Sequence, residues 1–242
     1  MRLRAALALL AAPLAFSPSL AQNAAPVAPA APQAVPAPAP AEYVYVALTV
    51  PQGVVTLALD KIHAPLTTAN FLKYVDARKM DGAVFYRAMH LDHDPAQGLL
   101  QGGVRNGANL LPPVAHEPNS RSGIKHVAGT VSMARFAPGS AQADFLILLS
   151  DMPSLDARPG DDGTDPGAGF AAFGHVASGM DVVRTIWSLP RSATKGEGVM
   201  KGQILEQDVK IISARRTKAP LQDNNAPRPR VEAAIVVQGS PA

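Results

Sequence analysis

Residues 43–59 read YVYVALTV-PQG-VVTLAL, two apolar stretches separated by a short turn. Both stretches are rich in residues that favour strands, and the Pro and Gly between them favour a turn, so the pattern predicts a β-hairpin. Five further apolar runs are each bounded by Gly, Pro, Asp or Asn. They cover residues 83–89, 99–103, 129–134, 145–150 and 171–176. We therefore expect a domain built mainly of β-strands.

Two segments have the spacing of amphipathic helices. Residues 64–78 place Pro65 in the first turn and repeat apolar residues on one side. Residues 179–189 show a similar stripe and stop before Pro190. Residues 204–214 read as a closing strand. One helix near each end of a set of antiparallel strands indicates a closed barrel capped by two α-helices.

Composition excludes several classes of protein. The chain has 242 residues, of which 47% are hydrophobic and 17% charged, so it can bury a core and is neither fully disordered nor collagen-like. The absence of cysteine excludes a disulfide scaffold, a Cys-ligated metal site and a thiol nucleophile. The net charge is +3, and removal of Arg2 and Arg4 leaves 20 basic against 19 acidic residues. Such a balance does not indicate a nucleic-acid partner.

The N-terminal residues 1–21 resemble a cleavable signal peptide. Arg2 and Arg4 precede a short apolar stretch, and Ser19-Leu20-Ala21 fits the small-x-small pattern of a cleavage site. The alternative is an uncleaved membrane anchor, but Pro13 interrupts the stretch and about 18 apolar residues are needed to span a bilayer. We therefore expect a periplasmic or secreted protein without stable membrane insertion after cleavage.

Three segments follow the predicted signal peptide. Residues 22–41 contain nine alanines, six prolines and no charge, which predicts a semi-rigid polyproline II linker. Residues 42–218 are long enough for one folded domain. Residues 219–242 are again rich in proline, and we expect a disordered tail there.

Three motifs in this order resemble the cyclophilin family of peptidyl-prolyl cis-trans isomerases. They are Phe85-Tyr86-Arg87, Leu100-Gln101-Gly102-Gly103 and residues 129–134, which read GTVSMA. The likeness extends over residues 43–216. It implies a mainly β fold, a closed eight-stranded antiparallel barrel capped by two α-helices, and the activity of a rotamase.

The resemblance also implies the residues of the site. Arg87 matches the catalytic arginine and Gln101 the glutamine that steadies it. Without the motif, an arginine in a strand would be interpreted as a surface residue in an ion pair. The residues implied to contact substrate are Phe85, Leu99, Leu100, Ala134, Arg135, Phe145, Leu146, Leu155 and Phe170.

The proline pocket departs from the family pattern. Leu146 replaces a phenylalanine, Asp144 a glutamine and Ser154 a tryptophan, and Phe170 lies near the position of a histidine. Arg135 replaces the usual asparagine, and Gly98-Leu99-Leu100 lacks the first pocket phenylalanine. Leucine can still bury a proline ring, but each lost aromatic contact removes roughly 0.5–1.5 kcal/mol of interaction energy with that ring. We therefore expect either an isomerase that assists the folding of exported proteins, or a weak or inactive peptide-binding module or chaperone.

The expected chemistry requires neither metal nor cofactor. Rotation about a peptide bond has a barrier of about 18–20 kcal/mol, and X–Pro bonds interconvert within tens to hundreds of seconds. A donor aimed at the prolyl nitrogen and an apolar pocket for the ring suffice. We expect a monomer that binds proline-containing polypeptides.

Two polar segments contain residue types that can bind metal ions. His90, His93 and Asp94 lie in a run between Arg87 and Gln101 that we interpret as an exposed loop. Residues 161–167 lack the alternating ligands of an EF-hand and are interpreted as a turn-rich loop.

Overall fold

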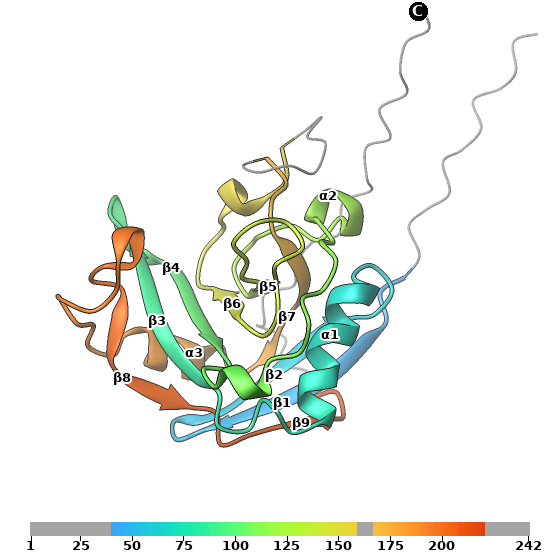
Figure 1. Cartoon of the computed structure of the whole chain (residues 1–242), viewed down its shortest axis with the longest axis horizontal. Helices are drawn as coiled ribbons and strands as arrows, with labels where there is room; N and C mark the ends of the chain where they lie inside the picture. The colour runs from blue at the N-terminus through green and yellow to red at the C-terminus, as the bar shows by residue number, and fades with distance from the viewer. Residues whose placement is uncertain (1–39, 159–166, 221–242) are drawn as a thin grey trace, which may run out of the picture. The chain divides into compact units, whose positions relative to one another are not determined.

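Nine antiparallel strands form one curled sheet around a shared interior (Figure 1). Their order is β8-β3-β4-β6-β5-β7-β2-β1-β9. The strands are β1 (Tyr43–Val50), β2 (Gly53–Asp60), β3 (Val84–Leu91), β4 (Asp94–Gly103), β5 (Thr130–Met133), β6 (Phe145–Leu148), β7 (Ala171–Ser178), β8 (Ile204–Lys210) and β9 (Ser213–Thr217).

This computed structural model describes residues 40–158 and 167–220. The predicted signal peptide, nearly all of the predicted linker and nearly all of the predicted tail lie outside the described residues. Most of the loop at 161–167 lies outside them as well.

The mainly β fold and the first hairpin are confirmed, but the strand number and closure differ from the prediction. The expected closing strand, 204–214, is divided at Ile211 and Ile212 into β8 and β9. The Ile211 amide donates to Ala83, whereas the Ile212 amide donates to Thr49 on the other side of the sheet. Because β8 pairs with β3 and β9 with β1, the two are opposite edges of an open, curled sheet. The expectation of eight strands in a closed barrel is therefore corrected.

In the described part of the chain, three α-helices and three short 3₁₀ turns connect the strands. The helices are α1 (Pro65–Asp76), the single turn α2 (Asn119–Ser122) and α3 (Met180–Trp187); the 3₁₀ turns are η1 (Gly107–Asn109), η2 (Pro153–Leu155) and η3 (Gly198–Met200). The helices α1 and α3 are the two predicted from sequence. The first packs against β9, β7 and β2, and the second against β2, β3 and β4. Within the described ranges, no helix is long and apolar enough to cross a membrane.

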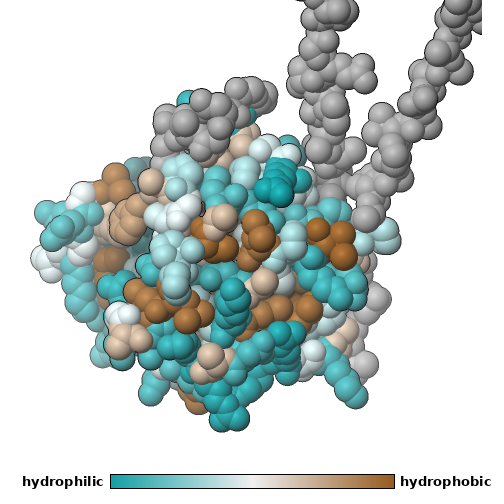
Figure 2. Space-filling model, turned by 45° about the vertical axis from the view of Figure 1, so that its right-hand side comes forward, coloured by the Kyte–Doolittle hydropathy of each residue, from teal (hydrophilic) through white to brown (hydrophobic). Residues whose placement is uncertain are grey.

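The interior is filled by alternate residues of the strands and by the inner side of α1. Phe71 of α1 lies between Phe145 and Phe173, with ring centroids 5.4 and 5.5 Å away, and Phe145 also contacts Phe85 at 5.6 Å. All four rings are almost completely buried. Figure 2 shows a face on which hydrophilic residues predominate and hydrophobic residues form small, separate patches. Burial of these aromatic and aliphatic side chains therefore contributes most of the packing that stabilises the domain.

A buried carboxylate replaces the missing cap of α1. The N-cap residue, Ala64, has no side chain that can accept a hydrogen bond. Glu117, only 1% exposed, accepts instead from the Leu66 amide at 3.3 Å, the Thr67 amide at 3.0 Å and the Thr67 hydroxyl at 2.8 Å. A negative charge at a helix N-terminus is favourable, so Glu117 joins the segment after β4 to α1.

The variant Glu117→Ala should lower the free energy of unfolding by about 1.5–3 kcal/mol, because it leaves buried donors without their charged acceptor. Glu117→Gln should lose less, since the amide oxygen still accepts. Urea denaturation measures both. The exposed Glu206→Gln in β8 is the control, and wild-type stability of Glu117→Ala would disprove the capping role.

Candidate active site

A β-bulge in β3 places Tyr86 and Arg87 on the same side of the sheet. Phe85 is opposite Gly102 and Arg87 is opposite Gln101, so Tyr86 is an extra residue in β3. Side chains normally alternate along a strand, which would point Phe85 and Arg87 in the same direction. With the bulge, Phe85 is fully buried in the interior, whereas the side chains of Tyr86 and Arg87 both form a hydrogen bond with Gln101.

Two glutamine side chains hold the guanidinium of Arg87. Its Nη1 donates to Gln101 Oε1 at 2.9 Å. Its Nε and Nη2 donate to Gln203 Oε1 at 2.8 and 2.6 Å. A guanidinium has five N–H groups, so one on Nη1 and one on Nη2 remain without a partner among the described residues. No acidic side chain of the described ranges forms an ion pair with Arg87.

A chain of hydrogen bonds fixes the orientation of the Gln101 amide. Gln101 Nε2 donates to the Tyr86 hydroxyl, and that hydroxyl donates to Asp144 Oδ2 at 2.6 Å. The Gln101 oxygen is therefore left facing Arg87. Asp144 fits here because Gly103 lacks a side chain: a Cβ on Gly103 would lie 1.9 Å from Asp144 Oδ1.

Burial dominates the electrostatics of these groups. It raises the pKa of the Asp144 carboxyl, although the hydrogen bond from Tyr86 and the charge of Arg105 act in the opposite direction. Burial, followed by the nearby Asp144 charge, raises the pKa of the Tyr86 hydroxyl. Burial lowers the pKa of Arg87, yet arginine remains protonated in proteins. Arg87 is thus a cation in a partly desolvated setting, held by neutral oxygens.

An apolar cluster lies on the outer face of the sheet beside Arg87 and Gln101. We call it the leucine cluster; its buried members are Leu99, Leu146, Leu148 and Met152, and Met89, Leu91, Ala134 and Leu155 pack against them. Gln101 is directly opposite Leu146 in the β4–β6 pair, and Arg87 is opposite Gln101 in the β3–β4 pair. A polar donor and an apolar surface are therefore neighbours in one row across three strands.

The sequence-predicted contact residues divide into two groups. Leu99, Ala134, Leu146 and Leu155 come together in the leucine cluster. The side chains of Phe85, Leu100 and Phe145 do not, because each is fully buried in the interior core. Their assignment to the substrate surface is corrected: they occupy strand positions that face inward, and they support the site from behind.

The backbone at Gly98 leaves no room for a side chain. Gly98 has φ +155°, and a Cβ there would lie 1.9 Å from the Met89 carbonyl oxygen. A side chain at this position is therefore strained whatever its chemistry. The close approach of β3 to β4 therefore excludes a pocket side chain at Gly98.

Arg135 and Phe170 lie at the edge of the site and contact each other. The Arg135 guanidinium is 4.8 Å from the centroid of the Phe170 ring. Its Nε and Nη2 donate to the Gly169 carbonyl oxygen at 3.0 and 2.6 Å. The Phe170 amide donates to the Leu155 carbonyl oxygen at 2.9 Å, which links this pair to the leucine cluster through the backbone.

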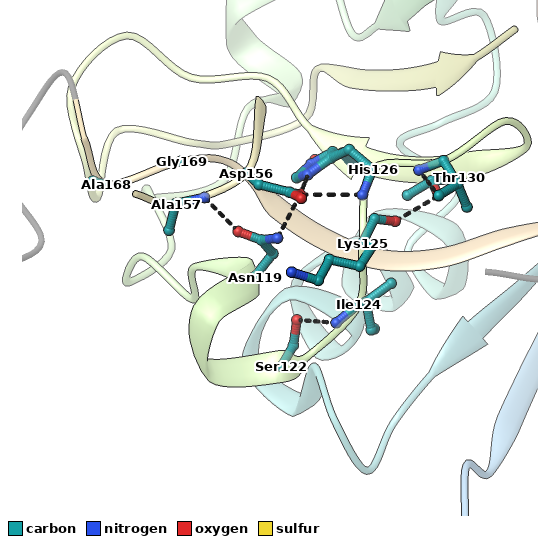
Figure 3. Close-up of polar contacts among 12 residues, drawn as sticks. Asn119, Ser122, Ile124, Lys125, His126, Thr130, Asp156, Ala157, Ala168 and Gly169 are labelled. Atoms are coloured by element: carbon teal, nitrogen blue, oxygen red, sulfur yellow. Dashed lines mark hydrogen bonds and ion pairs between the residues drawn. The ribbon is translucent and has the colours of Figure 1, made fainter. Parts of the chain in front are cut away.

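A buried polar network fastens the segment that carries Leu155 (Figure 3). His126 Nδ1 is 2.7 Å from Asp156 Oδ1, and His126 Nε2 is 2.9 Å from Ser132 Oγ. Asn119 also donates to Asp156. Burial raises the pKa of Asp156, but the hydrogen bond and charge of His126 outweigh it and hold that pKa below its usual value.

These groups have the composition of a nucleophilic triad but not its accessibility. Ser132 is 0% and His126 1% exposed, so no substrate reaches the hydroxyl. His126 also accepts from the Met152 amide through its carbonyl oxygen at 2.8 Å. The network therefore positions Met152 and Leu155 against β5.

A cavity of about 770 Å³ adjoins the site, and Gln101 is one of the residues that line it. Tyr86, Ala134, Asp144, Met200 and Ile204 are among the residues that line it. One of its lining residues, Phe136, is an apolar side chain that is 89% exposed.

The segment between Arg87 and Gln101 is only partly the exposed loop that was expected. His90 and Asp94 belong to β3 and β4, which corrects the expectation for them, whereas His93 lies in the exposed turn between these strands. β3 and β4 extend to Leu91 and Asp94. His90 stacks on Trp187 with centroids 3.7 Å apart and Nδ1 2.8 Å from the Pro95 carbonyl oxygen. In the parts of the chain that the structure describes, no three His, Asp or Glu side chains gather into a metal-binding group.

Sequence reasoning missed Gln203, Met152 and the anchoring role of His126. Gln203 is 116 residues from Arg87 and belongs to no motif that we recognised. Met152 follows the β6 run by a few residues and directly precedes the turn η2. His126 precedes the motif at 129–134 and gave no signal beyond that proximity.

The chain is similar to proteins of one family. Residues 45–216 match the family model described as cyclophilin type peptidyl-prolyl cis-trans isomerase/CLD. The peptidyl-prolyl cis-trans isomerase A of Dickeya dadantii is 32% identical over 171 residues, which cover 69% of this chain and 84% of that protein. A peptidyl-prolyl cis-trans isomerase of Acinetobacter baylyi is 33% identical over 169 residues, covering 67% and 80%.

Solved structures share the fold at lower identity. A cyclophilin type peptidyl-prolyl cis-trans isomerase of Cryptosporidium parvum superposes with a TM-score of 0.57 at 17% identity, covering 74% of this chain and 100% of that one. Its structure in the presence of the dipeptide Ala-Pro gives 0.55 at 18% identity, covering 72% and 99%.

Replacement of Asp144 tests the electrostatics of the site. Its raised pKa means that the folded protein holds a proton at this carboxyl more tightly than the unfolded chain does, so the group loses its contribution to stability as pH rises. Asp144→Asn keeps an acceptor for Tyr86 without the buried charge. Its melting temperature at pH 7 should equal or exceed that of the wild type.

The difference between Asp144→Asn and wild type should shrink as the pH is lowered, because wild-type Asp144 then becomes neutral. Thermal denaturation from pH 7 to pH 4 measures this, with the exposed Asp208→Asn as the control. A variant that is less stable than wild type at pH 7, and gains as pH falls, would contradict the assignment.

Proposed function

Since the chain belongs to the cyclophilin-type peptidyl-prolyl cis-trans isomerase family, we propose that Arg87 and the leucine cluster together catalyse rotation of X–Pro bonds in exported polypeptides. The chain is an isomerase of the cyclophilin type. The observation that carries the proposal is the position of Arg87, which has no acidic partner among the described residues, directly beside an apolar surface.

Arg87 acts on the prolyl nitrogen. As the bond twists, the nitrogen lone pair leaves resonance with the carbonyl and becomes a hydrogen-bond acceptor. The free N–H groups on Nη1 and Nη2 then stabilise the twisted state more than the planar one, which is the requirement for a faster reaction. Because Gln101 and Gln203 are neutral, Arg87 keeps its full charge for this contact.

The leucine cluster binds the proline ring. Leu99, Leu146 and Leu155 supply apolar area next to Gln101, and Ala134 leaves room for an extended peptide. The Ala134 amide donates to the backbone carbonyl oxygen of Asp144, so the end of β5 is already fixed when substrate arrives. Burial of the ring against leucine contributes about 25 cal/mol per Å² removed from water.

Proline-containing polypeptides are the proposed clients. A relative of the same fold was solved in the presence of Ala-Pro, a minimal X–Pro unit. The cavity beside Gln101, with the exposed Phe136 in its lining, accepts residues that flank the X–Pro bond. The near balance of basic and acidic residues fits a polypeptide client better than a nucleic acid.

The proposed place of action is the periplasm or the exterior of the cell. The support is the sequence of residues 1–21, with its charged start, apolar stretch and small-residue cleavage site. We further propose that residues 22–41 serve as a spacer, and that the protein acts as a monomer without a cofactor. One chain supplies Arg87, both glutamines and the entire leucine cluster.

A second candidate function is a peptide-binding module with little catalysis. It is favoured by Leu146 in place of an aromatic residue and by the glycine backbone at position 98. Both features reduce the contact with a proline ring. The position of Arg87, held by two neutral glutamines and without an acidic partner in the described ranges, favours the enzyme instead.

The variant Arg87→Ala should reduce kcat/KM for an X–Pro peptide by about 10²–10³, using about 2.7–4 kcal/mol for the loss of one transition-state donor. Peptide affinity should change far less, because the planar nitrogen is a poor acceptor. A protease-coupled isomerisation assay and calorimetry measure the two quantities. The exposed Arg184→Ala in α3 is the control.

Leu146→Phe should leave the rate unchanged or raise it, since it restores a ring contact in the leucine cluster. Gly98→Phe adds the same ring on strained backbone and should lower both stability and rate. If the native protein binds peptides but leaves the uncatalysed rate unchanged, the module is correct and the enzyme is not.

The mature protein should begin at Gln22. Export removes residues 1–21 if they are a signal peptide, so N-terminal sequencing of protein from its native host measures the cleavage point. Mature protein that retains Met1 in a membrane fraction would identify an anchor instead.

A further inference from the structure

We propose that Gln203 is a positioning residue for Arg87, and that a neutral acceptor at this position is required for the activity. This inference rests on the proposed function of the same site. It adds a residue from a distant part of the chain and assigns a reason for its chemistry.

Gln203 occupies one whole edge of the guanidinium. A single oxygen, Gln203 Oε1, accepts from Nε at 2.8 Å and from Nη2 at 2.6 Å. Gln101 accepts only from Nη1, at 2.9 Å. One acceptor alone would let the planar group rotate about its single hydrogen bond. Two acceptors on different edges fix both its plane and its direction.

The backbone holds Gln203 in place independently of its side chain. The Ala88 amide, next to Arg87 in the chain, donates to the Gln203 carbonyl oxygen at 2.9 Å. The Gln203 amide donates to the Met200 carbonyl oxygen at 3.0 Å, and Ile204 is opposite Arg87 in the β3–β8 pair. Loss of the side chain should therefore leave the local fold intact.

The neutrality of Gln203 is as significant as its position. A carboxylate at the same place would accept both N–H groups with similar geometry, but it would neutralise the cation. Burial makes such a pair strong, and a neutralised arginine attracts the developing lone pair on nitrogen less. Gln203 therefore has two roles: its oxygen holds the Arg87 guanidinium in place, and its neutrality preserves the positive charge of that group.

Two variants separate these roles. Gln203→Ala removes the acceptor, and we expect kcat to fall about tenfold with KM changed less than about twofold, because only the alignment in the transition state suffers. Gln203→Glu keeps the acceptor but adds a charge, and we expect kcat to fall although Arg87 stays ordered. Gln207→Ala, which alters an exposed glutamine of the adjoining strand β8, is the control.

The ordering of Arg87 is measured without substrate. In ¹⁵N NMR spectra of the full chain, the Arg87 Nε–H signal should be protected from solvent exchange in wild type and Gln203→Glu, and lose protection in Gln203→Ala. This measurement remains valid even if the protein has no isomerase activity, so failure of the proposed function is distinguishable from failure of this proposal.

Wild-type kcat in Gln203→Ala, or full protection of its Nε–H, would overturn the positioning role. Wild-type kcat in Gln203→Glu would overturn the requirement for a neutral acceptor. If Gln203→Ala proves unstable by thermal denaturation, Gln203→Glu and the NMR signal of Arg87 still decide between these outcomes.

Discussion

The extra residue in β3 is the constraint on which the site depends. Without it, the alternation of the strand would turn Arg87 toward the same side as the fully buried Phe85, where an arginine would have to desolvate completely. With it, Phe85 supports the core and Arg87 faces outward beside Gln101. The bulge therefore lets a large aromatic interior and a charged donor occupy positions two residues apart.

The rest of the site follows from where the neighbouring strands place their outward residues. In β4 and β6 these are Leu99, Gln101 and Leu146, so the polar and apolar halves of the site meet across one ladder. Glutamines rather than carboxylates hold Arg87. The protein thus keeps a strong donor at the expense of a partly desolvated cation, whose pKa is lowered by burial.

Strand periodicity accounts for both the successes and the errors of prediction from sequence. The hairpin, the short strands and the helices α1 and α3 were predictable because their apolar spacing matches their burial. Leu100 was misassigned, although its position between Leu99 and Gln101 places it on the opposite face. The same rule applies to Phe145 beside Leu146.

Other features have no local signal in the chain. The break at Ile211 and Ile212 arises because these two residues bond to different edges of the sheet, and both are apolar like the strands around them. The strained backbone at Gly98 depends on the approach of Met89 from the opposite strand. Gln203 reaches Arg87 only because β8 pairs with β3, a contact that single-sequence patterns do not encode.

The central claim is that a positioned arginine cation and a leucine surface are sufficient for catalysis. The most direct measurement is NMR exchange spectroscopy of an Ala–Pro peptide mixed with the full chain, read together with the peptide-induced shift of the Arg87 Nε–H signal. Our account predicts cis–trans exchange well above the rate of the free peptide, accompanied by a shift at Arg87. Peptide binding at the leucine cluster with exchange no faster than in free peptide would contradict it.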